Sequence, residues 1–272
     1  MTGGFLTCFC LLTFAFIFIS HRESAQLALS IPPFLHVSST KFLIYARTCK
    51  NYQLRGIITL SYHRGTMTEA IRIYFENRAP TWNSMMPDNL DDALHQMLTP
   101  FVEVLAQAQT LLEIGTGTGA LIPHLASYAP GARRVSVDLA HSMLQQANVR
   151  CPDARLAQVD AHRLPFASGQ HLQFDVVVCH NSFPHFTDRP RALVEIHRVL
   201  RPGGQLLIVH NNPRERVNAI HTRAGGPIAN DLLPPGDELR NLLVQTGYEN
   251  VWVEDNDIHY LARASCKLNK TS

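Results

Sequence analysis

The stretch that decides the fold is "LLEIGTGTGALIPHL", Leu111 to Leu125, in which an apolar run leads through three closely spaced glycines into a helical pattern. Gly115, Gly117 and Gly119 follow the apolar run directly. Glycine permits a tight turn and lets backbone amides approach a ligand with no side chain in between. The stretch therefore predicts a strand, a ligand-binding turn and a helix. A tight turn without a ligand is the alternative interpretation.

Outward from this turn, short apolar runs alternate with helical patterns. Helices are predicted at 67 to 78 and 89 to 109, and near 119 to 128, 141 to 149, 188 to 200, 213 to 221 and 236 to 246. Strands are predicted at 110 to 115, 133 to 139, 155 to 160, 174 to 180 and 205 to 211, with a closing pair near 250 to 255 and 259 to 267. This alternation predicts an α/β fold, a parallel sheet with helices on both faces. Ligands bind such sheets beyond the carboxyl ends of the strands.

The composition, with 46% hydrophobic and 17% charged residues, is that of an ordinary globular protein. Residues 67 to 272 carry 18 basic and 21 acidic side chains, which argues against a nucleic-acid-binding surface. The six cysteines show no C-x-x-C or zinc spacing, so no metal is expected from them. Scattered cysteines of this kind favour the reducing cytoplasm over a disulfide-linked secreted protein.

The first 66 residues differ from the rest of the chain. Phe5 to Ile19 is an uninterrupted apolar run that resembles a signal-peptide core or a short membrane anchor. The basic residues that follow it would hold the remainder in the cytoplasm if the run were inserted. The alternative is that residues 1 to 66 are not part of the native product and that translation starts at Met67. We expect an N-terminal extension over 1 to 66 that lies outside the fold, and one domain over 67 to 272 without membrane contact.

The glycine turn alone does not select its ligand. With Ala120 its spacing also fits the dinucleotide fingerprint G-x-G-x-x-[GA]. Asp138 ends the second predicted strand, where an acid can accept hydrogen bonds from ribose hydroxyls of NAD or of another nucleoside. Both classes of ligand therefore remain open on these residues.

Further motifs distinguish the two. "LLEIGTGTG", "VSVDLAHSMLQQA", "AQVDAHRLPF", "FDVVVCHNSFPHFTD" and "ALVEIHRVLRPGGQLLIVH" follow one another in this chain. Together with the lead-in "YFENRAPTWN" they resemble the class I S-adenosylmethionine-dependent methyltransferases, in the small-molecule branch similar to methyltransferase types 11 and 25. The resemblance runs from about residue 70 to 260 and covers nothing before Met67. It implies a Rossmann-like doubly wound sheet of seven strands in the order 3-2-1-4-5-7-6, with the last strand antiparallel.

The resemblance also implies a cofactor, S-adenosylmethionine, and roles for particular residues. Glu113 and the glycine turn would cradle its methionine portion, Asp138 its ribose and Met143 its adenine ring, and Asp160 with the backbone of Ala161 would read the adenine edge. The full set of cofactor-binding residues expected from the resemblance is Glu113, Gly115, Thr116, Gly117, Gly119, Asp138, Leu139, Met143, Asp160, Ala161 and His180. The chain departs from the family at Ala140, where Ser is common, and at Pro184, where a first His is common. The resemblance implies that adenosine binding is intact and that the second departure lies on the substrate side.

Four histidines lie at or after the ends of the fourth and fifth predicted strands: His180, His185, His210 and His221. Neutral histidine is the usual proton acceptor near pH 7, so these residues are the candidate catalytic bases. His185 occupies a position that the family often fills with His. A divalent metal held by histidines and Glu215, or histidines that merely pack, are the alternatives. Asn211 and Asn218 are candidate donors to an acceptor, and Asp231 is a weaker one.

The predicted function is methyl transfer from S-adenosylmethionine to a small-molecule acceptor by in-line displacement, with a histidine as base. The chain lacks the [DN]-P-P-[YF] motif of nucleobase-amine enzymes at the end of its fourth predicted strand. A non-catalytic S-adenosylmethionine-binding module is the first alternative, and an NAD-dependent oxidoreductase is the second. The aromatic residues Tyr74, Phe75 and Trp82 are expected, from the resemblance, to form a lid over the cofactor.

Overall fold

The computed structural model describes residues 58–59, 67–166 and 173–267. The chain divides into two units, Met1–Lys41 and Phe42–Ser272, and every described residue lies in the second. The apolar run from residue 5 to 19 lies outside the described residues, as does all of the predicted extension except Ile58 and Thr59. Within the described ranges, each helix is too short or too polar to cross a bilayer.

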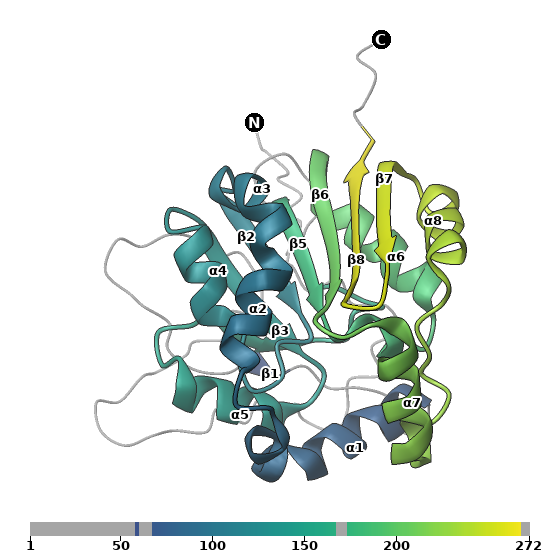
Figure 1. Cartoon of the computed structure of the whole chain (residues 1–272). Coiled ribbons are helices and arrows are strands. Elements are labelled where there is room, and N and C mark those ends of the chain that lie inside the picture. Colours follow the sequence, from purple (N-terminus) through teal and green to yellow (C-terminus); the bar gives the residue numbers. More distant parts are fainter. Residues whose placement is uncertain (1–57, 60–66, 167–172, 268–272) are drawn as a thin grey trace, which may run out of the picture. The chain divides into compact units, whose positions relative to one another are not determined.

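A single eight-stranded sheet in the order β1-β4-β3-β2-β5-β6-β8-β7 organises the second unit (Figure 1). The strands are β1 (Ile58–Thr59), β2 (Thr110–Ile114), β3 (Arg133–Asp138), β4 (Leu156–Gln158), β5 (Phe174–His180), β6 (Leu200–His210), β7 (Tyr248–Asp255) and β8 (Tyr260–Cys266). The pairs from β1 to β6 are parallel, whereas β8 pairs antiparallel with both β6 and β7. Without β1, this is the predicted seven-stranded order 3-2-1-4-5-7-6 with its last strand antiparallel, and the fold class is confirmed.

The short strand β1 was not expected. Ile58 and Thr59 pair in parallel with Ala157 and Gln158 of β4 and extend the edge of the sheet. Two residues before Met67 therefore take part in the sheet, although we predicted that the fold begins at Met67. The segments 1–57 and 60–66, over which the rest of that prediction runs, lie outside the described residues.

The central strand β5 is largely apolar because both faces of the sheet are covered there. In β5, Val176 and Val178 pack in one core, which includes Leu98 of helix α2 (Leu90–Leu98). Val177 and Cys179 pack in the other, which includes Ile196 of helix α6 (Arg189–Val199). Alternate side chains of a strand point to opposite faces. A strand buried on both faces must therefore be apolar at nearly every position.

The helices divide between these two faces. They are α1 (Met67–Trp82), α2 (Leu90–Leu98), α3 (Val102–Ala106), α4 (Ile122–Tyr128), α5 (His141–Arg150), α6 (Arg189–Val199), α7 (Arg214–Ala224) and α8 (Gly236–Gln245). Residues of α2, α3 and α4 form the core on one face, and residues of α6 and α8 pack on the other. The predicted helix at 89 to 109 is divided by a 3₁₀ turn, Thr99–Phe101, which contains Pro100. Proline lacks the amide hydrogen that a continuous α-helix needs.

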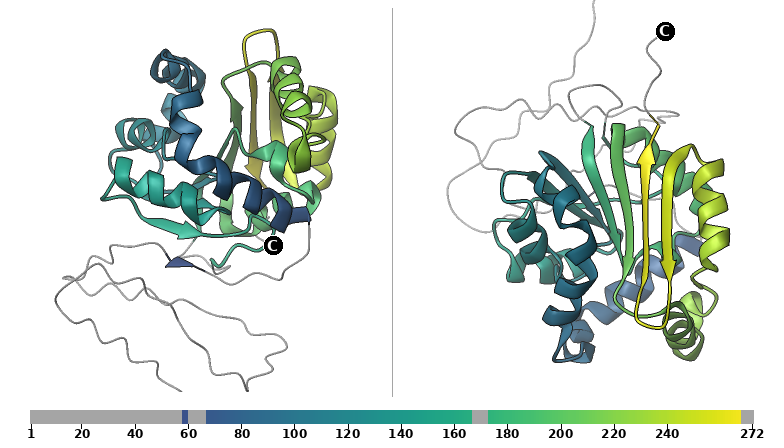
Figure 2. Two further views of the ribbon diagram at one scale, coloured as in Figure 1. Left: turned by 90° about the horizontal axis from the view of Figure 1, so that it is seen from below. Right: turned by 45° about the horizontal axis from the view of Figure 1, so that its top comes forward.

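Helix α1 does not pack on a face of the sheet but passes along one end of it, between α5 and α7 (Figures 1 and 2). It reaches the segment after β5 through Thr68, whose hydroxyl oxygen lies 2.9 Å from that of Thr187. At its other end, Asn83 accepts a 2.7 Å hydrogen bond from the Thr118 hydroxyl in the glycine turn. The helix therefore spans the carboxyl edge of the parallel strands, where ligands bind in folds of this class.

Candidate functional site

The glycine turn between β2 and α4 is held by the neighbouring strand β3. The amides of Gly115 and Thr116 donate to the Val137 carbonyl at 2.8 and 3.0 Å. Gly115, Gly117 and Gly119 have φ angles of +80°, +55° and +79°. These values lie in the left-handed region, where a side chain is strained. The three glycines therefore meet a conformational requirement of this turn.

Gly115 is also required by close packing. A β-carbon at this position would lie 2.2 Å from the β-carbon of Ser182, just after β5. The Ser182 hydroxyl in turn donates to the Ile114 carbonyl at 2.7 Å. A β-carbon at Gly117, by contrast, would meet no atom within 4 Å. The turn is thus locked against β5 at one glycine and open at the next.

Glu113, at the end of β2, is fully buried. Its Oε2 accepts hydrogen bonds from the hydroxyls of Thr116 at 2.9 Å and Ser136 at 2.7 Å. Its Oε1 is buried without a hydrogen-bond partner among the described residues. Burial raises the pKa of this carboxyl to about 7, against the lowering effect of the two hydroxyls. An unpaired buried carboxylate oxygen indicates that a donor group from a ligand belongs here.

Replacement of Glu113 by Gln is expected to remove a pH-dependent loss of stability. The folded-state pKa of about 7 lies above the ordinary value of 4.5. The Glu113 contribution to stability is therefore fully present below about pH 4.5 and is lost as the pH rises through 7. Over this interval the wild type should lose up to about 3 kcal/mol of unfolding free energy relative to Glu113→Gln.

Urea unfolding of both proteins between pH 4.5 and 8 measures this difference. Glu103→Gln is the matched control, because Glu103 is exposed on α3. Parallel stability curves for the wild type and Glu113→Gln would show that Glu113 ionises freely.

Asp138, at the end of β3, accepts hydrogen bonds from two backbone segments, the glycine turn and the residues that precede α5. Its Oδ2 accepts from the Gly117 amide at 2.7 Å and its Oδ1 from the Ala140 amide at 2.8 Å. Burial raises the pKa of the Asp138 carboxyl to about 6, while these two amides and the nearby His185 act to lower it. Each carboxylate oxygen has a second lone pair, so two further donors can still be accommodated.

Asp160 has a partner that the sequence did not indicate. Its Oδ1 accepts from the His162 amide at 2.9 Å and lies 2.5 Å from the His162 Nδ1. His162 Nε2 accepts from the Asp188 amide at 3.0 Å, so the ring proton resides on Nδ1 and is directed at Asp160. Burial opposes ionisation of Asp160, but the His162 hydrogen bonds lower its pKa overall. The next residue, Ala161, is buried.

Met143 and Leu139 flank Asp138 beneath α1. Met143 is 2% exposed and forms a small cluster with Ala79 and Ala140, against which Phe75 and Trp82 pack. The Leu139 carbonyl accepts from the Gln158 side chain at 2.9 Å. The aromatic residues predicted as a lid therefore reach the part of the chain predicted to bind adenine.

Glu76 anchors α1 to this site and was missed by sequence reasoning. Its two oxygens accept from the amides of His141 and Ser142 at 2.8 and 2.7 Å, at the start of α5. Burial opposes ionisation of Glu76, but these hydrogen bonds and Arg72 lower its pKa. Glu76 lies 65 residues before His141, and no local pattern indicates this contact.

Three of the four candidate histidines lie together. His185 Nδ1 is 2.8 Å from Asp231 Oδ2, and His221 Nδ1 is 2.5 Å from the Asp231 carbonyl oxygen. The rings of His185 and His221 are 4.8 Å apart, and Phe75 packs edge-on against His185 at 4.8 Å. The 222 to 235 segment thus brings Asp231 to the histidines, and α1 closes over them.

His210, the last residue of β6, is 1% exposed. Neither of its ring nitrogens has a hydrogen-bond partner among the described residues. Burial holds its pKa well below the usual value, and His180, His185 and His221 lower it further. His210 is therefore a neutral, buried imidazole without a hydrogen-bond partner in the described ranges, and it lies within electrostatic range of the other three histidines.

His180 lies on the other face of the sheet. It is opposite Val209, which belongs to the core with α2 and α4, whereas Ile208 belongs to the core with α6. Strand alternation therefore separates His180 from His210. Burial lowers the pKa of His180 to about 4, and His124 of α4 contributes. His180 Nε2 accepts from the Asn181 side chain at 3.0 Å.

The other polar candidates are engaged elsewhere. Asn211 accepts from Asn181 at 2.8 Å, and Asn218 exchanges hydrogen bonds with the backbone of Leu233 at 2.7 and 3.1 Å. Glu215 is exposed and pairs with Arg214. In the described part of the chain, no three His, Cys, Asp or Glu side chains are arranged to hold a metal ion. The metal alternative with Glu215 thus has no support in this geometry.

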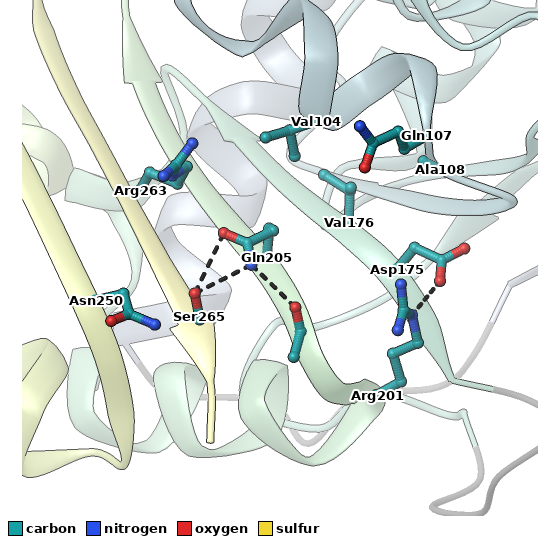
Figure 3. Close-up of a pocket in the computed structure, with 11 residues that line it drawn as sticks. Val104, Gln107, Ala108, Asp175, Val176, Arg201, Gln205, Asn250, Arg263 and Ser265 are labelled. Atoms are coloured by element: carbon teal, nitrogen blue, oxygen red, sulfur yellow. Dashed lines mark hydrogen bonds and ion pairs between the residues drawn. The ribbon is translucent and has the colours of Figure 1, made fainter. Parts of the chain in front are cut away.

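A separate open hollow of about 300 Å³ lies at the amino ends of the parallel strands, away from the carboxyl ends that carry the glycine turn (Figure 3). It is lined by Asp175 and Val176 at the start of β5, by Arg201 and Gln205 in the first half of β6, and by α3. Asp175 pairs with Arg201 in its wall. This hollow is at the amino ends of the parallel strands and is distinct from the glycine turn and the histidines.

The comparisons with known proteins agree with this geometry. Residues 112–208, from β2 into β6, match the family described as "Methyltransferase domain". This segment is similar to methyltransferase domains. A structure of a SAM-dependent methyltransferase from Aquifex aeolicus superposes with a TM-score of 0.55 at 18% identity, over 70% of this chain and 98% of that one. This likeness shows that the chain shares the fold of that protein.

Two curated relatives are similar in sequence. The chain is 39% identical to the demethylmenaquinone methyltransferase of Thermus thermophilus over 107 residues. This aligned segment covers 38% of this chain and 47% of that protein. It is 33% identical to the malonyl-[acyl-carrier protein] O-methyltransferase of Geobacter sulfurreducens over 158 residues. This aligned segment covers 54% of this chain and 58% of that protein. The chain thus spans about half the length of the curated relatives that it matches. The similarity is to methyltransferases with different acceptors.

Proposed function

We propose that the protein transfers the methyl group of S-adenosylmethionine to a small-molecule acceptor, with His185 as the base that removes the acceptor's proton. The observation that carries this proposal is the His185–Asp231 pair, placed beside a glycine turn at the carboxyl edge of a methyltransferase domain. The names of the relatives in Thermus thermophilus and Geobacter sulfurreducens, and of the Aquifex aeolicus structure, support the reaction and the cofactor.

The residues around the glycine turn fit S-adenosylmethionine. Glu113 Oε1 is buried and has no hydrogen-bond partner among the described residues, and it would accept a hydrogen bond from the cofactor's ammonium group directly or through a bridging water. The space in front of Gly117 admits the ligand to the backbone. The free lone pairs of Asp138 would accept two ribose hydroxyls. When bound, the cofactor supplies an activated methyl group, so the protein has to align the acceptor and take its proton.

The adenine side is formed by the remaining expected residues. Asp160, held by His162, retains Oδ2 for the exocyclic amine, and the Ala161 amide is next to it. Met143 lies in the cluster that includes Phe75 and Trp82, so the cofactor's ring would meet a wall shared by α5 and α1. His180 lies toward α4, on the face that carries the glycine turn's helix, which suits a cofactor-side role better than a base.

The geometry of His185 suits a base. Asp231 accepts a hydrogen bond from the Nδ1–H group of His185, so the opposite nitrogen, Nε2, carries the free lone pair. Nε2 makes no hydrogen bond to any residue in the described ranges. The aspartate also stabilises the imidazolium that forms when Nε2 takes a proton. His185 influences the pKa of Asp138, so the base and the ribose-binding acid lie within electrostatic range of each other.

We place this activity in the cytoplasm. Cys151, Cys179 and Cys266, the three cysteines in the described ranges, are all free thiols. Unpaired cysteines at several positions are typical of a reducing compartment.

Calorimetric titration of the full chain with S-adenosylmethionine, S-adenosylhomocysteine and NADH tests the proposal. We expect the two adenosyl ligands to bind with micromolar dissociation constants and NADH not to bind. A folded sample that binds NADH, or that binds neither adenosyl ligand, would contradict the assignment of the cofactor. Transfer of a labelled methyl group to small-molecule acceptors then tests the reaction itself.

A further inference from the structure

The buried imidazole of His210 differs from the other three histidines in its hydrogen bonding. His185 and His221 each use one ring nitrogen on Asp231, and His180 accepts from Asn181. His210 is 1% exposed, and both of its nitrogens are unpaired among the described residues. Buried polar side chains are nearly always hydrogen-bonded, and an exception calls for an explanation.

The surrounding protein does not supply the missing partner. The nearest described ring, Tyr260, lies 6.0 Å from His210, and its hydroxyl already donates to the Pro234 carbonyl at 2.9 Å. β6 is paired on both sides, to β5 and to β8, so neighbouring backbone groups are engaged in the sheet. The described protein atoms therefore supply no hydrogen-bond partner for His210.

The chemistry of the site favours a neutral partner. A neutral imidazole has one N–H donor and one bare nitrogen acceptor. A hydroxyl can serve either nitrogen, whereas a carboxylate can serve only the donor and an ammonium only the acceptor. Burial and the neighbouring histidines keep His210 uncharged.

The nearby cations are also committed. Arg189 donates to the carbonyls of Pro184 and Leu232, and Arg214 is paired with Asp255 and Glu215. The side chains that influence the pKa of His210 are the other three histidines, and no Lys or Arg of the described residues is among them to balance an anion. An anionic acceptor group would therefore be poorly stabilised here.

We propose that His210 binds a hydroxyl of the methyl acceptor and that the protein selects neutral, hydroxyl-bearing acceptors. This inference rests on the proposed function and names the substrate class of the same site. The rings of Phe75, Tyr260 and His221 around the cluster suit an aromatic acceptor, because aromatic rings pack edge to face. Phenol is therefore the simplest probe.

Binding of four probes with one ring and different polar groups tests this proposal. Phenol, toluene, benzoate and benzylamine are titrated into the full chain saturated with S-adenosylhomocysteine, with ¹⁵N-histidine NMR as the readout. In the wild type, we expect phenol to bind at least about tenfold tighter than the other three and to shift the His210 ring resonances. In His210→Phe and His210→Leu, this preference should disappear. His95→Phe is the control, because His95 is exposed on α2.

A second measurement needs no probe. Because the ligand-free protein buries an unpaired imidazole, His210→Leu should keep or raise the melting temperature, whereas loss of a structural hydrogen bond would lower it. Preference for benzoate or benzylamine, a phenol preference unchanged in His210→Phe and His210→Leu, or absence of any phenol-dependent shift at His210 would overturn the proposal. Failure of the proposed function itself would be seen separately, as absence of S-adenosylhomocysteine binding.

Discussion

Asp138→Ala is expected to weaken the binding of S-adenosylmethionine and S-adenosylhomocysteine by about 100-fold or more. The carboxylate would accept two ribose hydroxyls, and hydrogen bonds to charged groups contribute about 1.5 to 3 kcal/mol each. The same side chain holds the amides of Gly117 and Ala140, so its removal also loosens the glycine turn. Calorimetric titration of the folded variant measures the change in dissociation constant.

Two further variants separate the causes of this loss. Asp257→Ala, in the exposed turn between β7 and β8, should leave the affinity unchanged. Asp138→Asn retains one acceptor oxygen, so its affinity should lie between those of the wild type and Asp138→Ala. If Asp138→Ala bound S-adenosylhomocysteine within threefold of the wild type, Asp138 would not be the ribose ligand.

His185→Gln is expected to lower the rate of methyl transfer by about 10²- to 10⁴-fold, the usual contribution of a general base. Its affinity for S-adenosylhomocysteine should change little, because in the proposed role the ring would contact the acceptor and not the cofactor. Asp231→Asn keeps an oxygen that accepts from Nδ1 but removes the charge that stabilises the imidazolium. The rate of methyl transfer by Asp231→Asn should fall on the order of tenfold, because charge-assisted hydrogen bonds are about twice as strong as neutral ones.

The rates are measured at saturating concentrations with the first acceptor that takes up a labelled methyl group. The pH profile distinguishes loss of a base from a structural defect. Without the base, the rate of His185→Gln should rise with pH as the acceptor loses its own proton, and should approach the wild-type rate at high pH. His95→Gln, on the exposed side of α2, should behave like the wild type. If the rate of His185→Gln were reduced equally at every pH, or were reduced by less than tenfold, His185 would not be the base.

The order of the secondary structure was readable from the sequence because each element has a local signature. The strand 174 to 180 was predicted with the bounds that β5 has, and α5 was predicted to within one residue. The glycine turn was equally readable, since three positive φ angles demand glycine. These features depend on the periodicity and backbone preferences of neighbouring residues.

The histidine cluster was predicted only as a set. The sequence placed His180 and His210 at strand ends, but strand alternation puts His180 on the face with α4 and His210 on the other. That Asp231 orients His185 depends on a contact between residues 46 positions apart. The contact follows from how the 222 to 235 segment returns to the sheet, and periodicity contains no information about that path.

The sequence by itself determined the doubly wound fold, the glycine turn and the acid at the end of β3, because each of these is set by short-range chemistry. Only the tertiary structure decided which polar groups are paired. It showed that Glu76 caps α5 from α1, and that Glu113 Oε1 and the ring of His210 are buried without a hydrogen-bond partner among the described residues. Hydrogen bonding between distant segments depends on packing in three dimensions, so the partners of a buried side chain cannot be counted until the chain has folded.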